Sequence, residues 1–140
     1  MILISHRGNL NGKTDDENNP KYIEEALNQG FDVEVDVWYI DNQFWLGHDD
    51  PQYRVEEKYL ENPKFWCHAK NIDGLYKMLD NSNIHCFFHQ EDDVTLTSNG
   101  YMWTYPDKEL TKKSICVTPE TVDKSIDCYG VCTDFVTRWI

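Results

Sequence analysis

The sequence predicts an α/β fold built on a parallel sheet, either open or closed into a barrel. Short apolar segments rich in Val, Ile, Cys and aromatic residues recur along the chain, and helical patterns separate several of them. Alternation of strands with helices implies right-handed crossovers between parallel strands. No internal repeat, low-complexity tract or linker interrupts residues 1–140, so we expect a single domain.

Eight segments have the composition of β-strands. They cover residues 2–5, 32–38, 44–47, 65–68, 85–89, 101–105, 115–117 and 130–133. A helix is expected over residues 20–30, between the first two strands. Pro20 stands at its start, apolar residues recur at helical spacing, and Gly30 follows its end. Weaker helical patterns predict further helices over residues 71–79 and 119–126.

The composition restricts the partners of this chain. It carries 25 acidic residues against 13 Lys and Arg, for a net charge of -12. Such a field repels nucleic acid and anionic membrane surfaces, so we expect neither as a partner. No apolar run approaches the roughly 18 residues of a transmembrane helix, and the apolar start is too short for a signal peptide. We therefore expect a cytoplasmic protein without stable membrane insertion, with five reduced cysteines in its core.

The segment 32–38 is abnormal for a buried strand. Period-two alternation puts three valines on one face and Asp32, Glu34 and Asp36 on the other. A buried parallel strand is usually apolar on both faces. Two enclosed carboxylates two residues apart raise each other's pKa unless a cation lies between them, and oxygen ligands suit Mg²⁺ or Ca²⁺. On the strand alone, an edge strand with its acidic side in water is an equal alternative.

Two histidines stand where expected strands end. His6 follows the strand over residues 2–5, and His48 follows the strand over residues 44–47. In α/β folds, ligands bind at the C-terminal ends of the strands. A single histidine is more often structural than catalytic. Two of them at strand ends, beside an acidic pair, favour a functional site.

These residues, in this order, resemble the opening of the glycerophosphodiester phosphodiesterase family, which is related to the phosphatidylinositol-specific phospholipase C barrels. The matching segments are His6-Arg7-Gly8, Glu17-Asn18, Ala26 with Gly30-Phe31-Asp32, Glu34-Val35-Asp36-Val37, Asp41 and His48-Asp49. Three later segments also resemble strands of that family: His68-Ala69-Lys70, Trp103-Thr104 and Gly130-Val131-Cys132-Thr133-Asp134. The resemblance is most specific over residues 6–49.

The resemblance implies a compact, reduced (β/α)8 TIM-type barrel that hydrolyses a small-molecule phosphodiester with one divalent cation, Mg²⁺ or Ca²⁺. A barrel of this type needs at least about 200 residues, and this chain has 140. Several outer helices are therefore expected to be missing or shortened. A homodimer is one way to cover the exposed barrel wall.

The resemblance also assigns roles to individual residues. It makes His6 and His48 the acid and base, in an order that the sequence leaves open. Glu34 and Asp36 hold the metal. His68 stands where the family commonly has an acidic third ligand, so His68 itself, Glu17 or water takes that place. The residues expected to contact the substrate are Arg7, Lys70, Glu17 and Trp103. The planar fork of an arginine fits two phosphate oxygens, whereas a lysine is a point charge.

Three other functions fit the same residues. A related lyase would act on sphingolipid or lysophospholipid head groups and release a cyclic phosphate. A noncatalytic barrel would bind a phosphorylated metabolite or a partner protein, a role that the missing third carboxylate favours and the two histidines oppose. A cation-binding structural protein would bind Ca²⁺ tightly without turnover of a diester.

Overall fold

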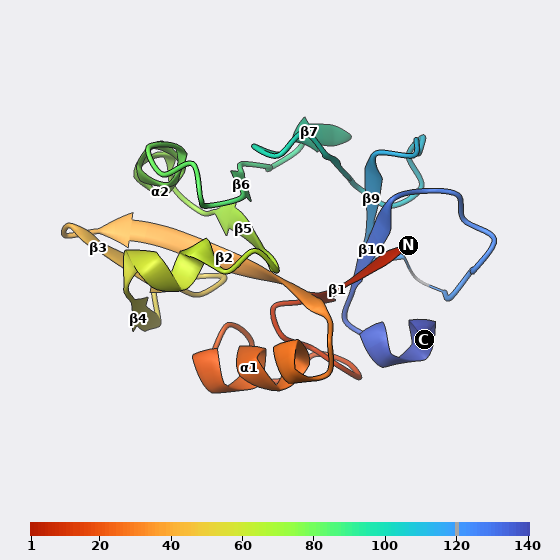
Figure 1. The fold of residues 1–140 in the computed structure, drawn as a ribbon, viewed down its shortest axis with the longest axis horizontal. Helices are drawn as coiled ribbons and strands as arrows, with labels where there is room; N and C mark the ends of the chain where they lie inside the picture. Colours follow the sequence, from red (N-terminus) through yellow and green to blue (C-terminus); the bar gives the residue numbers. More distant parts are fainter. Residues whose placement is uncertain (120) are drawn as a thin grey trace.

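The computed structural model describes residues 1–119 and 121–140, which form one curled sheet with two α-helices beside it (Figure 1). The strands are β1 (Ile2–His6), β2 (Asp32–Ile40), β3 (Gln43–Leu46), β4 (Tyr53–Val55), β5 (Phe65–Ala69), β6 (Cys86–Phe87), β7 (Val94–Leu96), β8 (Met102–Thr104), β9 (Ser114–Val117) and β10 (Gly130–Thr133). The helices are α1 (Pro20–Asn28), α2 (Ile72–Leu79) and the 3₁₀-helices η1 (Glu57–Glu61) and η2 (Val136–Trp139). Within the described ranges, no helix is both long enough and apolar enough to cross a membrane.

The centre of the sheet is parallel and its flanks are antiparallel. The parallel strands follow the order β6-β5-β2-β1-β10-β9-β8. The β3–β4 hairpin pairs antiparallel with the second half of β2, and β7 pairs antiparallel with β8. The long strand β2 thus has three partners, because β1 and β3 follow one another along the edge opposite β5.

The predicted (β/α)8 TIM-type barrel is wrong. Most regular elements of the described chain are strands, and they form a curled, mixed half-barrel with only two α-helices beside it (Figure 1). The helix predicted over residues 119–126 is not formed at residues 121–126, and residue 120 lies outside the described part. Connections such as residues 105–113 are shorter than the dozen or so residues that a helical crossover needs. Turns and antiparallel strands therefore replace the outer helices.

The two α-helices begin at side-chain caps. Asn19 accepts a hydrogen bond from the backbone N–H of Lys21 at 3.0 Å and starts α1, with a proline in the first turn. Asn71 accepts from the N–H of Gly74 at 2.9 Å and starts α2. The Asn71 side chain also bonds the N–H and the carbonyl of Tyr39, so the same residue fixes α2 to the end of β2.

The two faces of β2 point into different environments. Its three valines, Val33, Val35 and Val37, are fully buried in a cluster that includes side chains of α1, α2 and η1. Glu34 and Asp36 lie on the opposite face, 1% and 0% exposed. The predicted alternation is confirmed. The alternative of a solvated edge strand is wrong, because β2 has partners on both edges.

Candidate functional site

The course of β2 brings both predicted histidines to one place. His6 ends β1 and is in register with Glu34. Gly47, which follows β3, donates its backbone N–H to the carbonyl of Asp36 at 3.1 Å. The next residue, His48, is therefore carried to the edge of β2 that His6 already occupies. Residues 42 positions apart thus approach one another because β1 and β3 share an edge.

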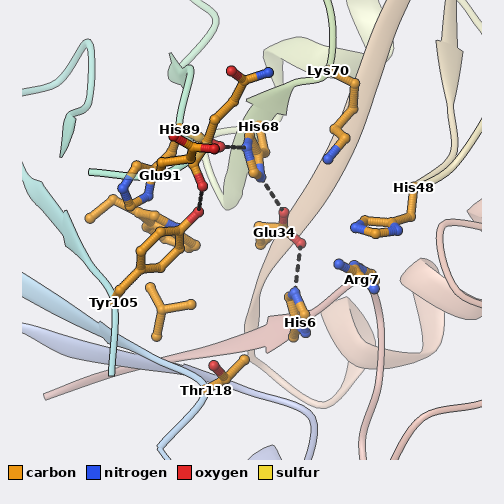
Figure 2. Close-up of a pocket in the computed structure, with 13 residues that line it drawn as sticks. His6, Arg7, Glu34, His48, His68, Lys70, His89, Glu91, Tyr105 and Thr118 are labelled. Atoms are coloured by element: carbon orange, nitrogen blue, oxygen red, sulfur yellow. Dashed lines mark hydrogen bonds and ion pairs between the residues drawn. The ribbon is translucent and has the colours of Figure 1, made fainter. Parts of the chain in front are cut away.

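The opposite edge of β2 completes a hollow of about 580 Å³ (Figure 2). On that edge, β5 places His68 in register with Asp36, and Lys70 follows with its N–H bonded to the Val37 carbonyl at 2.8 Å. The hollow is lined by His6, Arg7, Glu34, His48, His68, Lys70, His89, Gln90, Glu91, Trp103, Tyr105, Val117 and Thr118. Its polar side comes from β1, β2, β5 and the turn after β3.

Two glycines make the turns that present the histidines. After His6, both Arg7 and Gly8 have positive φ, +58° and +91°. A Cβ at Gly8 would lie 2.8 Å from the ring of Tyr22. A Cβ at Gly47 would lie 1.9 Å from the carbonyl oxygen of Asp50. Each motif therefore needs its glycine for close packing of the backbone.

Glu34, Asp36 and His68 form a cluster that could hold a metal ion. Nδ1 of His68 lies 3.4 Å from Oε2 of Glu34 and 3.6 Å from Oδ1 of Asp36. One ligand atom from each residue lies within 4.8 Å of the others. Oε1 of Glu34 and Oδ1 of Asp36 are buried and find no hydrogen-bond partner in the described chain. Buried, unpartnered carboxylate oxygens fit a cation, which would offset their loss of water.

The two carboxyl groups of the cluster have pKa values shifted in opposite directions. Burial and the charge of Glu34 raise the pKa of Asp36 to about 6. Burial also raises the pKa of Glu34, but the neighbouring His68 and His6 outweigh it, and the net shift is downward. Without a cation, the site therefore favours one charged carboxylate and one that takes up a proton readily.

Asp134 holds the imidazole of His6. Nδ1 of His6 lies 2.7 Å from Oδ1 of Asp134, and Nε2 lies 3.9 Å from Oε1 of Glu34. A carboxylate only accepts, so Nδ1 is the donor and Nε2 is left for the hollow. Burial lowers the pKa of His6, but the hydrogen bond to Asp134 and the charge of Glu34 outweigh this and raise it above its ordinary value.

Arg7 lies between the hollow and a second group of acids. Its Nε is 3.1 Å from Oδ2 of Asp36, at an angle that makes no hydrogen bond, and its Nη1 is 3.6 Å from Oε1 of Glu17. Glu17 accepts a hydrogen bond from Asn9 at 2.5 Å and lines a neighbouring hollow rather than the one at His6. Glu17 is therefore placed to hold Arg7.

Asn18 holds the second carboxylate of the cluster. It is fully buried, donates Nδ2–H to Oδ2 of Asp36 at 2.9 Å, and accepts the backbone N–H of Asp36 at 2.9 Å. These bonds leave Oδ1 of Asp36 to face His68. Buried hydrogen bonds of this kind orient a potential metal ligand from behind.

His48 and Lys70 form the solvated rim. Nδ1 of His48 lies 2.9 Å from Oδ1 of the exposed Asp49. Burial and the charges of Arg7 and Lys70 lower the pKa of His48. Lys70 forms no ion pair with any residue in the described ranges, although it lines the hollow.

The far wall of the hollow is aromatic. Trp103 is 2% exposed and packs on Phe87 with ring centroids 4.5 Å apart. Tyr105 stacks on His89 at 3.9 Å and donates its hydroxyl hydrogen to the carbonyl of Gln90 at 2.6 Å. Trp103 is therefore mainly a floor of the hollow, and Tyr105 stands nearer the opening.

The structure gathers eight of the nine predicted site residues. Seven of them line the hollow: His6, Arg7, Glu34, His48, His68, Lys70 and Trp103. Asp36 lies beside the hollow, in the side-chain cluster that could hold a metal ion. Glu17 lies behind Arg7 and does not face the hollow. Two supporting residues, Asp134 and Asn18, were not assigned a role from sequence. Both lie in segments that match the family motif, and a polar residue beside a strand end was their only signal.

The chain matches no protein-family model, no curated protein and no solved structure at a significant level.

Proposed function

We propose that this chain is a metal-dependent phosphodiesterase that hydrolyses a glycerophosphodiester-type substrate. One observation carries the proposal: two histidines, the buried carboxylate of Glu34 and two cationic side chains from separate segments line one hollow (Figure 2), and the buried Asp36 lies beside Glu34 in the candidate metal site. The resemblance of residues 6–49 to the glycerophosphodiester phosphodiesterase family supports it.

Local cations offer a phosphodiester its binding site. The chain as a whole repels an anion, because its net charge is -12. Arg7 and Lys70 both line the hollow, on the side that holds the two histidines. When bound to Glu34, Asp36 and His68, a divalent cation would supply further positive charge to a nonbridging phosphate oxygen. These charges oppose the repulsion between the phosphate and an attacking oxygen.

The environments of the two histidines suggest which is the acid. The raised pKa of His6 favours the protonated imidazole, whose Nε2–H is available for donation. The lowered pKa of His48 keeps that ring neutral, and because Nδ1 bonds Asp49, Nε2 carries the free lone pair. We therefore assign His6 as general acid and His48 as general base.

In the proposed step, the oxygen of the attacking hydroxyl bonds to phosphorus, and Nε2 of His48 accepts the hydroxyl proton. The bond between phosphorus and the leaving oxygen breaks, and Nε2–H of His6 protonates that oxygen. Arg7 and Lys70 hold the nonbridging oxygens during the transfer. The attacking hydroxyl is water in a hydrolase and a neighbouring substrate hydroxyl in the related lyase, which forms a cyclic phosphate.

A cytoplasmic location is part of this proposal. All five cysteines are free within the described chain, and four of them are buried. Reduced cysteines are typical of the cytosol, where disulfides rarely persist. The small-molecule diester would then be a cytoplasmic metabolite from lipid turnover.

The experiment is a substrate panel on the purified full chain. Glycerophosphocholine, glycerophosphoethanolamine and bis-p-nitrophenyl phosphate are incubated with chelator or with added divalent cations, and products are followed by phosphorus NMR. We expect turnover that chelation abolishes and a cation restores, with a phosphomonoester as product. A cyclic phosphate would identify the lyase. No turnover with any diester and any cation would refute the proposed activity.

A further inference from the structure

We propose that His68 makes the cation site a mixed nitrogen and oxygen centre, which prefers a later first-row ion such as Co²⁺ or Zn²⁺ over Mg²⁺ or Ca²⁺. The inference rests on the proposed function, because it names the class of cation that the same site uses. It departs from the Mg²⁺ or Ca²⁺ that the two carboxylates alone suggest.

The hydrogen bond on the far side of the His68 ring fixes its tautomer. Nε2 of His68 lies 3.0 Å from the backbone carbonyl oxygen of His89. A carbonyl only accepts, so Nε2 must carry the hydrogen. In the neutral imidazole, Nδ1 then carries a lone pair, which faces Glu34 and Asp36. A carbonyl that orients a ring in this way is typical of histidines that bind metals.

Packing holds the His68 ring in this orientation. The ring stacks on Phe87 with centroids 4.8 Å apart and an angle of 21° between the planes. The stack and the bond to the His89 carbonyl together restrain both rotatable bonds of the side chain. Nδ1 is therefore aimed at the acidic pair before any ion arrives, which lowers the entropy cost of binding one.

Three electron-rich atoms face one another across this cluster. They are Nδ1 of His68, Oε2 of Glu34 and Oδ1 of Asp36. Two ligand atoms that bind the same ion at about 2.1 Å lie roughly 3 to 4 Å from one another. The two contacts of Nδ1, 3.4 Å and 3.6 Å, fall in that range. Without an ion, the lone pairs repel, and Oδ1 of Asp36 keeps no hydrogen-bond partner among the residues described.

Imidazole changes the ion that such a site selects. Carboxylate, carbonyl and water oxygens suit Mg²⁺ and Ca²⁺, whereas imidazole nitrogen suits later first-row ions. A nitrogen in place of a third carboxylate also removes one negative charge from the site. The affinity of hard cations falls more from this change than the affinity of softer ones.

The competing interpretation is that His68 is an imidazolium that neutralises the two acids itself. In that case Nδ1 would donate to a carboxylate oxygen. Nδ1 lies 3.4 Å from Oε2 of Glu34 and 3.6 Å from Oδ1 of Asp36, however, and both distances exceed the roughly 2.7 to 2.9 Å of a hydrogen bond between an imidazolium and a carboxylate. The geometry therefore favours a bound ion, and the two interpretations predict opposite results in a binding experiment.

The test measures cation binding and does not use turnover. The chelator-stripped full chain is titrated by calorimetry with Mn²⁺, Co²⁺, Mg²⁺ and Ca²⁺. Electron spin echo spectra of the Mn²⁺-loaded chain then report any directly bound nitrogen. We expect one site, at least about tenfold tighter for Co²⁺ than for Mg²⁺, and a nitrogen modulation in the Mn²⁺ spectrum. The unmodified chain thus decides the matter even if a variant fails to fold.

Substitutions then assign the nitrogen. His68→Glu should lower the ratio of Co²⁺ to Mg²⁺ affinity by about tenfold or more and abolish the nitrogen modulation, and His68→Gln should abolish the modulation as well. His48→Asn is the matched control, because it removes a partly exposed histidine that lines the same hollow and should change neither result.

Failure of the inference differs from failure of the proposed function. Equal or tighter binding of Mg²⁺, a spectrum without nitrogen, or no binding of any ion would overturn the inference. In the last case His68 would be the imidazolium. Diester turnover with Mg²⁺ alone would leave the proposed activity standing without the inference. Tight, nitrogen-bound Mn²⁺ with no turnover would leave the inference standing without the activity.

Discussion

The His6 Nδ1 and Asp134 Oδ1 atoms lie 2.7 Å apart, although 128 positions separate the two residues in the chain. They meet because β1 and β10 are parallel neighbours, and each residue stands at the C-terminal end of its strand. Asn9 also donates to Asp134 at 2.9 Å, which fixes the carboxylate. The orientation of the proposed acid therefore depends on pairing between the first and last strands.

Asp134→Asn should shift the alkaline limb of the pH profile of kcat/KM to lower pH. Asp134 and Glu34 raise the pKa of His6, and a general acid loses activity as pH rises through its pKa. Removing the carboxylate lowers that pKa, so the loss begins earlier, and the rate at neutral pH falls by about tenfold or more. Asp49→Asn, next to His48, is the control and should leave the alkaline limb in place. An unchanged alkaline limb in Asp134→Asn would remove His6 as the acid.

Replacement of either histidine of the hollow by Ala should abolish most turnover. His6→Ala and His48→Ala remove the proposed acid and base, and each is expected to lose on the order of 10²-fold or more in rate. Steady-state assays on a diester measure the loss, and circular dichroism verifies the fold. His85→Gln is the control, because His85 is buried against Trp66 and bonded to Thr97, outside the hollow. Near-normal rates for His6→Ala or His48→Ala would contradict the mechanism.

Asn18→Ala should weaken cation binding by about 10- to 100-fold. The variant removes the side chain that bonds both Oδ2 and the backbone N–H of Asp36. It also leaves a buried donor unpaired, which costs roughly 1 to 3 kcal/mol of stability. Calorimetry and thermal unfolding measure the two effects. Asn19→Ala is the matched control: it removes the cap of α1 and costs about 1 kcal/mol without a change in cation affinity. Equal affinities for the two variants would show that Asn18 does not position the site.

The metal-free chain should lose stability as pH rises through about 6. Burial and the charge of Glu34 raise the pKa of Asp36 from 3.8 to about 6, so the folded state holds a proton that the unfolded state has released. The free energy of unfolding therefore falls with increasing pH across the window from about 4 to about 6. Thermal unfolding in the presence of chelator measures this slope. Asp36→Asn should flatten it, and a slope that survives in that variant would assign it to other groups.

Addition of a divalent cation should raise the unfolding temperature of the chain. An ion that binds only the folded state stabilises by about 2.7 kcal/mol at a hundred times its Kd. The gain is larger above pH 6 because the ion binds the charged form of Asp36 and competes with its proton. Glu34→Gln should remove most of the gain, because it removes one of the two proposed carboxylate ligands. A cation response that persists in Glu34→Gln would place the ion elsewhere.

The strands and the site were more predictable than the overall architecture. All eight predicted strand segments overlap observed strands, because apolar and β-branched runs favour strands wherever they are buried. β4 and β7 escaped prediction, since each is three residues long and partly exposed. The prediction of a TIM-type barrel was wrong because the family resemblance does not account for the connections between strands of this chain. Those connections are too short to hold outer helices. Asp134 and Asn18 gained roles only from three-dimensional contacts.

The alternation along β2 ties the chemistry of the chain to its folding. Valines at odd positions fill the core beneath the helices, and Glu34 and Asp36 at even positions form the candidate metal site on the opposite face. An insertion or deletion of one residue in this strand would exchange the two sets and bury the acids beneath the helices. A one-residue insertion or deletion between Val33 and Val37 would therefore disrupt the core and the ion site together.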